Sequence, residues 1–162
     1  MTKLRVQFVH GLEGSPQGSK ARLLAEHFDT RTPAMDTGDF DACVARQAEV
    51  LAEFRPEVLV GSSFGGAVAV ALLARNLWTG PTLLLAQAAL RYDPEARLPH
   101  GVTVWLVHGL QDNIIDPEES RRLARTGSAD RVRLIEVEDD HPLHRSVASR
   151  RLLGWIEELA SG

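Results

Sequence analysis

A serine stands between two glycines in LVGSSFGG, residues 59–66, in the pattern Gly61-x-Ser63-x-Gly65. The preceding residues are apolar, and the small residues that follow favour a helix. This arrangement is typical of a nucleophile elbow, in which a serine lies at the tip of a sharp turn from strand to helix. Glycines are needed there because strand and helix approach each other closely. Ser63 therefore fits a nucleophile, whereas Ser62 lacks the matching glycines.

A serine hydroxyl becomes a good nucleophile only when a base removes its proton and an acid orients that base. Asp112 lies in VHGLQDNIID and His141 in VEDDHPLH. Both follow predicted strands, and the order Ser, Asp, His is the one that accompanies a nucleophile elbow. We predict Ser63 as the nucleophile, Asp112 as the acid and His141 as the base.

The roles of the acid and the base have alternatives nearby. Asp116 precedes Pro117 and is expected to cap a helix. His144 would fall in the first turn of the last helix, whereas His141 lies in the loop, nearer the strand end. Ser63 could itself be only a helix cap beside a tight turn.

A metal site is the other interpretation of the histidine region. Asp139, Asp140, His141 and His144 offer ligand-type side chains, but no further group at a ligand-like spacing joins them. A metal would also leave Ser63 unexplained. We therefore expect neither a metal nor a cofactor.

The negative charge that develops on an attacked carbonyl oxygen needs backbone N–H donors. Phe64, directly after the serine, is expected to supply one, and Leu12 in the glycine-rich HGLEGSP is expected to supply the other. His10 and His108 each precede a glycine at a strand end and are expected to shape loops. The expected substrate pocket is formed by Leu12, Glu13, Gln87, Leu90, Arg91 and Ile114.

Short apolar runs alternate with segments of helical period, which is typical of βαβ units on a parallel sheet. Ligands of such sheets bind outside the carboxyl ends of the strands, where all the candidate residues fall. Pro33 would confine the second strand to a sheet edge. Strands are expected at about 4–9 and 30–35 and in EVLVG, PTLLLAQA, GVTVWLVHG and RVRLIEVE, and helices near 19–27, 40–54, 64–77, from Pro117 and at 142–160.

The composition fits one globular domain over residues 1–162. The formal net charge of −4 argues against nucleic acid as a partner. No apolar run approaches the roughly 18 residues of a membrane span, and the N-terminus lacks the apolar region of a secretion signal. The lone Cys43 is expected in the core and suits a reducing compartment. These features predict a cytoplasmic protein that acts on a small molecule.

Four segments together resemble the α/β-hydrolase superfamily and, within it, the small YqiA-type bacterial esterases. They are FVHGLEGSPQGSKA at 8–21, LVGSSFGGAVAVALL at 59–73, VHGLQDNIID at 107–116 and DDHPL at 139–143. The resemblance implies a minimal α/β-hydrolase: a mostly parallel sheet of about six strands in the order 2-1-3-4-5-6, helices on both faces and no cap domain.

The resemblance also implies an esterase or thioesterase that forms an acyl-enzyme on Ser63. The segment AALRYDPEARLPHG is shorter than the lid-like insertion of relatives, which suggests an open cleft. Two other functions remain open: a non-catalytic interaction module with the same fold, and an acyltransferase using the same triad. The sequence names neither the acyl group nor the oligomeric state.

Overall fold

The computed structural model describes residues 2–12 and 14–162. Its centre is a sheet of six parallel strands in the order β2-β1-β3-β4-β5-β6, which is the order that the resemblance implies. Because every neighbouring pair is parallel, the carboxyl ends of all strands lie along one edge. The strands are β1 (Arg5–Val9), β2 (Asp29–Arg31), β3 (Val58–Ser62), β4 (Thr82–Leu85), β5 (Val104–Gly109) and β6 (Val132–Val137).

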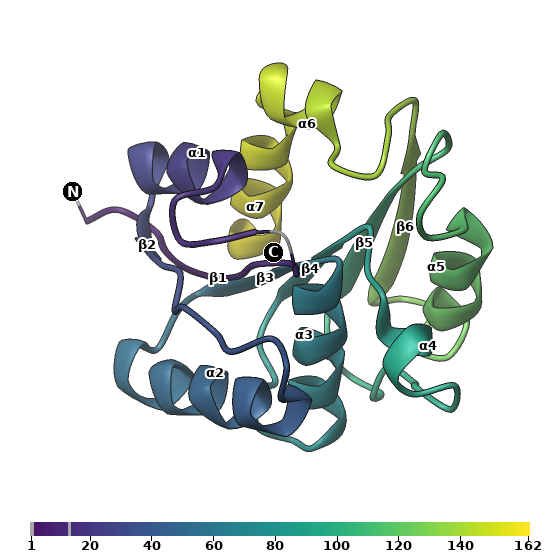
Figure 1. The fold of residues 1–162 in the computed structure, drawn as a ribbon, viewed down its shortest axis with the longest axis horizontal. Helices are drawn as coiled ribbons and strands as arrows, with labels where there is room; N and C mark the ends of the chain where they lie inside the picture. Colours follow the sequence, from purple (N-terminus) through teal and green to yellow (C-terminus); the bar gives the residue numbers. More distant parts are fainter. Residues whose placement is uncertain (1, 13) are drawn as a thin grey trace.

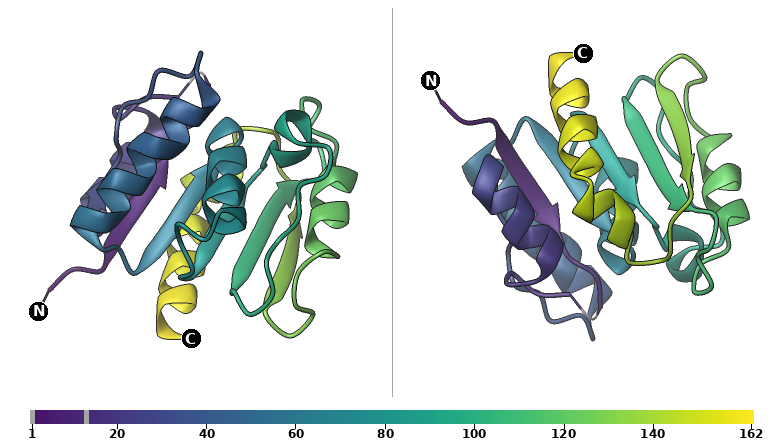
Figure 2. Two further views of the ribbon diagram at one scale, coloured as in Figure 1. Left: turned by 90° about the horizontal axis from the view of Figure 1, so that it is seen from below. Right: turned by 90° about the horizontal axis from the view of Figure 1, so that it is seen from above.

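Helices cover both faces of the sheet (Figures 1 and 2). Helices α1 and α7 pack on one face, and α2, α3, α4 and α5 pack on the other. Within the described ranges, no helix has both the length and the apolar character needed to cross a bilayer. The helices are α1 (Ser19–His27), α2 (Phe40–Phe54), α3 (Phe64–Ala74), α4 (Ala89–Tyr92), α5 (Pro117–Ala124), α6 (His144–Ala148) and α7 (Arg151–Ser161).

The central strands are apolar on both sides because each side meets a helix layer. In β3, Leu59 packs toward α2 and α3, whereas Val58 and Val60 pack toward α1 and α7. The same alternation occurs in β4, where Leu84 and Leu83 point to opposite layers. The sheet is thus held between two apolar layers, which gives a rigid support for the loops at its edge.

Helices 19–27 and 40–54 have the bounds that the sequence predicts, Cys43 is buried in α2, and Asp116 caps α5 through the N–H of Glu118. Four expectations need correction. The second strand ends at residue 31 instead of 35, two residues before Pro33, and α3 ends at 74 instead of 77.

The other two corrections concern the last helix and a one-turn helix that was not expected. The expected helix 142–160 is two helices, because Arg150 adopts a left-handed conformation with φ 65° and interrupts the helical hydrogen bonds. The four-residue α4 was not predicted, since one turn leaves no helical period to detect.

Candidate active site

Ser63 lies at the turn between β3 and α3 with φ 55° and ψ −114°, a backbone conformation that residues with a side chain rarely adopt. The surrounding glycines allow the turn. A Cβ on Gly61 would lie 2.5 Å from the carbonyl oxygen of Gly65, and a Cβ on Gly65 would lie 2.6 Å from the carbonyl carbon of Val9. The sequence therefore builds a sharp turn that presents the serine hydroxyl at the edge of the sheet.

The structure brings Ser63, His141 and Asp112 into one hydrogen-bonded row. Ser63 Oγ lies 3.1 Å from His141 Nε2, and His141 Nδ1 lies 2.8 Å from Asp112 Oδ2. A carboxylate only accepts hydrogen bonds, so Nδ1 carries the hydrogen and Nε2 is free to accept the serine proton. The row thus has the direction that base-assisted attack by a serine requires.

Asp112 is fixed by the loop that follows β5. Its Oδ1 accepts the backbone N–H groups of Ile114 and Ile115, each at 2.9 Å, and its side chain is fully buried. Oδ2 is left to face the imidazole of His141. These bonds hold the carboxylate in one orientation.

The loop that carries His141 is anchored by a second buried carboxylate. Asp139 accepts from the backbone N–H groups of Asp140, Arg145 and Ser146 and from the Ser146 hydroxyl, at 2.8–3.1 Å. This carboxylate satisfies backbone N–H groups in the first turn of α6 and so ties the two ends of the loop that carries His141 together.

His144 points away from Ser63. Its Nδ1 hydrogen-bonds Asp140 Oδ2, and its side chain is 75% exposed. The hydrogen bond from His144 lowers the pKa of the Asp140 carboxyl to about 2. Asp140 and His144 thus bond each other, whereas Asp139 binds the start of α6 and His141 lies between Ser63 and Asp112. Among the described residues, no group of three His, Cys, Asp or Glu side chains could hold a metal ion.

The two expected oxyanion donors come from two different segments near Ser63. Phe64 is the first residue of α3, so its N–H has no acceptor within the helix. Its ring is buried against Phe40 and Tyr92, which fixes the start of the helix. On the other side, the chain after β1 passes close to the serine, since a Cβ on Gly11 would lie 3.4 Å from Ser63 Cβ. Leu12 follows directly.

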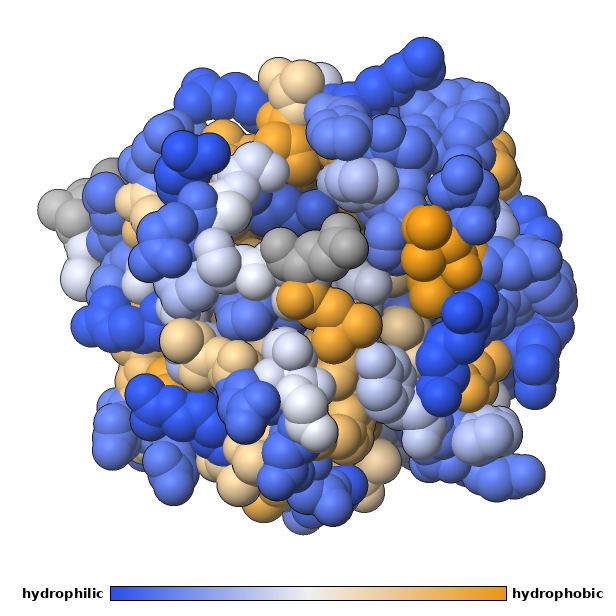
Figure 3. All heavy atoms as spheres, in the orientation of Figure 1, coloured by the Kyte–Doolittle hydropathy of each residue, from blue (hydrophilic) through white to orange (hydrophobic). Residues whose placement is uncertain are grey.

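The residues expected to form the pocket wall separate into different environments. Leu12 and Ile114 are exposed, at 55% and 57%. The face of the molecule in Figure 3 is mostly hydrophilic, with separate hydrophobic patches. Leu90 is half-buried and faces a small hollow next to Leu123 of α5. Glu13 lies outside the described residues.

Two polar residues of that group make side-chain contacts within the protein. The Arg91 guanidinium pairs with Glu119 and donates to the carbonyl of Ile114. Gln87 is fully buried, with its amide bonded to Ser120 and to the N–H of Ala89, so its side chain lies beneath the site and not on its wall.

Sequence reasoning missed one neighbour of the row. His108, the residue before the last of β5, is fully buried, with Nε2 3.1 Å from Asp112 Oδ2 and Nδ1 2.7 Å from the hydroxyl of Ser120. It was expected only to shape a loop. The spacing of four residues to Asp112 is the available signal, but the contact with Ser120 depends on how α5 packs.

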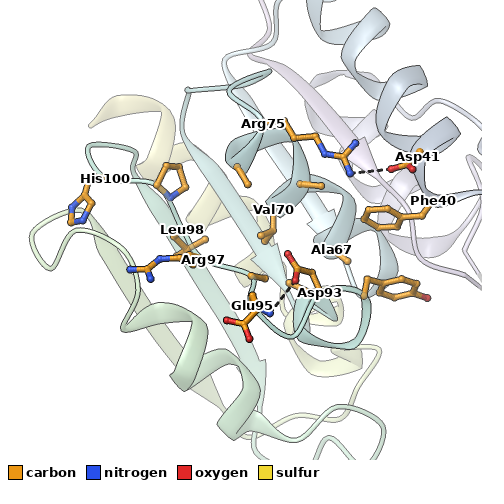
Figure 4. A pocket seen from close by; sticks show the side chains of 16 residues that line it. Phe40, Asp41, Ala67, Val70, Arg75, Asp93, Glu95, Arg97, Leu98 and His100 are labelled. Carbon is orange, nitrogen blue, oxygen red and sulfur yellow. Dashed lines mark hydrogen bonds and ion pairs between the residues drawn. The ribbon is translucent and has the colours of Figure 1, made fainter.

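A cavity of about 690 Å³ lies apart from this row, between α2, α3, α4 and the segment 93–100 (Figure 4). Its floor includes Ala67, Val70 and Leu98, and the Asp41–Arg75 ion pair stands at its rim. The buried ring of Phe64 lies between α3 and the aromatic pair that borders the cavity.

No protein-family model and no curated sequence matches the chain. Among solved structures, it is similar to a Xanthomonas campestris pv. campestris protein provisionally assigned as a hydrolase of the alpha/beta superfamily. That match has a TM-score of 0.81 at 22% identity and covers 100% of both chains.

Two further solved structures are also similar to this chain. Mouse alpha/beta hydrolase domain-containing protein 10 gives a TM-score of 0.73 at 18% identity, over 96% of this chain and 90% of that one. An alpha/beta serine hydrolase without a lid from Xanthomonas campestris gives 0.65 at 19% identity, over 93% and 79%. Together with the strand order, these likenesses show that the chain has the α/β-hydrolase fold.

Proposed function

We propose that this protein is a serine hydrolase that cleaves carboxylic esters or thioesters through an acyl-enzyme on Ser63. The observation that carries the proposal is the row Ser63 Oγ, His141 Nε2, His141 Nδ1 and Asp112 Oδ2, with spacings of 3.1 and 2.8 Å. The strained backbone of Ser63 supports it, because such strain persists where function requires it.

In the first step, Ser63 Oγ attacks the acyl carbon while its proton passes to His141 Nε2. Asp112 stabilises the imidazolium, and the N–H groups of Leu12 and Phe64 bind the oxyanion. His141 then gives its proton to the leaving alcohol or thiol. Water attacks the acyl-enzyme with His141 again as the base, and the products are the free acid and restored Ser63.

The substrate class is argued from the open surroundings of the serine. Between β4 and β5 the chain forms only the one-turn α4 and a loop, with no helical lid. The exposed Leu12 and Ile114 offer apolar contact near the nucleophile and near the acid. A small ester with a short acyl group suits a site without a lid better than a long chain, which needs an enclosed apolar tunnel.

The test is hydrolysis of a graded series of p-nitrophenyl esters and acyl thioesters from two to twelve carbons. We expect the highest kcat/KM at the short end and no turnover by Ser63→Ala. Ser62→Ala is the matched control and should retain activity. Equal rates for Ser63→Ala and the wild type would overturn the proposal, and added alcohols or amines distinguish hydrolysis from acyl transfer.

A further inference from the structure

The acid of the row is supported by a buried polar chain that starts on a different strand. Gln87 after β4, Ser120 on α5 and His108 at the end of β5 have no exposed surface. Three residues of types that prefer water are buried together directly beneath Asp112. Each must find hydrogen-bond partners, because an unpaired buried polar group destabilises the fold.

The direction of each hydrogen bond among Gln87, Ser120 and His108 can be worked out from one end of the series, the backbone N–H of Ala89. The backbone N–H of Ala89 can only donate, and it lies 2.8 Å from Gln87 Oε1, so the other end of that amide is the NH₂ group. Gln87 Nε2 therefore donates to Ser120 Oγ at 2.9 Å. The hydroxyl of Ser120 is left to donate its own hydrogen to His108 Nδ1 at 2.7 Å.

The contacts of Nε2, on the opposite side of the His108 ring, also indicate that the hydrogen is on Nε2 and that Nδ1 accepts. Nε2 lies 2.9 Å from the carbonyl oxygen of Ile115 and 3.1 Å from Asp112 Oδ2, and both oxygens only accept. Nε2 must therefore carry the hydrogen. The charged groups around the ring are Asp112 on its own loop and Glu136, its partner on β6, which is bound to Arg121.

We propose that His108, held as the Nε2–H tautomer by Ser120 and Gln87, is a positioning residue that fixes Asp112 for its contact with His141. It acts in two ways. Its N–H bonds the carbonyl of Ile115, whose own N–H holds Asp112 Oδ1, and its positive edge lies against Oδ2. This role rests on the proposed hydrolase function, since it acts through Asp112 on the base.

Two variants test the role by kinetics. His108→Leu keeps much of the volume and removes the N–H, so kcat should fall about 10- to 100-fold with KM nearly unchanged, because the ground-state contacts of the substrate are intact. His108→Gln can still place an N–H near Ile115 and Asp112 and should recover most of kcat. The matched control is His100→Gln on an exposed loop, which should equal the wild type.

The tautomer of His108 is measured in the wild-type protein, so this test remains informative even if His108→Leu does not fold. In ¹⁵N-histidine-labelled protein, the spectrum should show His108, assigned by its loss in His108→Gln, with hydrogen on Nε2 and none on Nδ1. A hydrogen on Nδ1, or wild-type kcat in His108→Leu, would overturn the proposal. If instead the wild type hydrolyses no ester while the tautomer is as described, the proposed function fails and not the proton placement.

Discussion

The glycine at position 65 offers a test of whether the sharp turn positions the serine. In Gly65→Ala, the new Cβ would lie 2.6 Å from the carbonyl carbon of Val9 and 2.7 Å from the carbonyl oxygen of His10, where ordinary contact begins at 3.4 Å. The carbonyl oxygen of Val9 is closer still, and all three obstacles are backbone, so α3 and β1 must separate by about 1 Å or more. Because Ser63 begins the same turn, its hydroxyl moves with the helix.

The size of the effect follows from this displacement. Overpacking of this kind costs about 1–3 kcal/mol of unfolding free energy, which lowers the Tm of a chain this long by roughly 2–12 °C. A misplacement near 1 Å costs about 100-fold in rate. We therefore expect Gly65→Ala to lose both stability and kcat/KM for a short ester, measured by thermal unfolding and initial rates.

The chain contains a matched control for the same substitution. Gly154 lies in α7, is exposed, and a Cβ there meets nothing within 4 Å. Gly154→Ala should raise the unfolding free energy by about 0.5–1 kcal/mol, because alanine favours the helix, and leave activity unchanged. If Gly65→Ala matched the wild type in both rate and Tm, the close-approach explanation of the elbow would be refuted.

Three further predictions concern the acid, the base and pH. Asp112→Asn keeps the shape of the side chain but removes the charge that orients His141, so kcat should fall on the order of 10³- to 10⁴-fold in a protein that still unfolds cooperatively; a fall below tenfold would contradict the assigned role. His141→Ala should abolish ester hydrolysis, whereas His144→Ala should stay within about twofold of the wild type, and the opposite result would exchange the two histidines. The folded pKa of Asp140 is about 2, below its unfolded value of about 3.9, so its stabilisation is present above roughly pH 4 and is lost as the pH falls toward 2. Urea unfolding from pH 2 to 6 should show a wild-type advantage over Asp140→Asn only in the upper part of that range, and an advantage independent of pH would contradict the pKa.

The strands and helices could be predicted because apolar runs and helical periods are local signals, whereas the strand order was implied by the resemblance to the α/β-hydrolase superfamily. The bounds of α1 and α2 follow from such signals, as does the Asp116 cap. The break at Arg150 could not be predicted, because neither glycine nor proline marks it.

In the candidate site, too, some features could be predicted from the sequence and others could not. The positions of Ser63, Asp112 and His141 at strand ends follow from the fold, so their meeting could be predicted from sequence order. The contacts of Gln87 and Arg91 could not, because α5 supplies their partners Ser120 and Glu119 through tertiary packing. Polar residues after strands therefore mark the edge of the sheet without showing which of them face the substrate.

The central claim is that Ser63 is an activated nucleophile, and covalent labelling tests it most directly. A fluorophosphonate reagent should add one group to the native protein, located on Ser63 by peptide mass spectrometry. Ser62→Ala should label like the wild type, and Ser63→Ala should not label. An unmodified wild-type protein, or a label that persists in Ser63→Ala, would contradict the account.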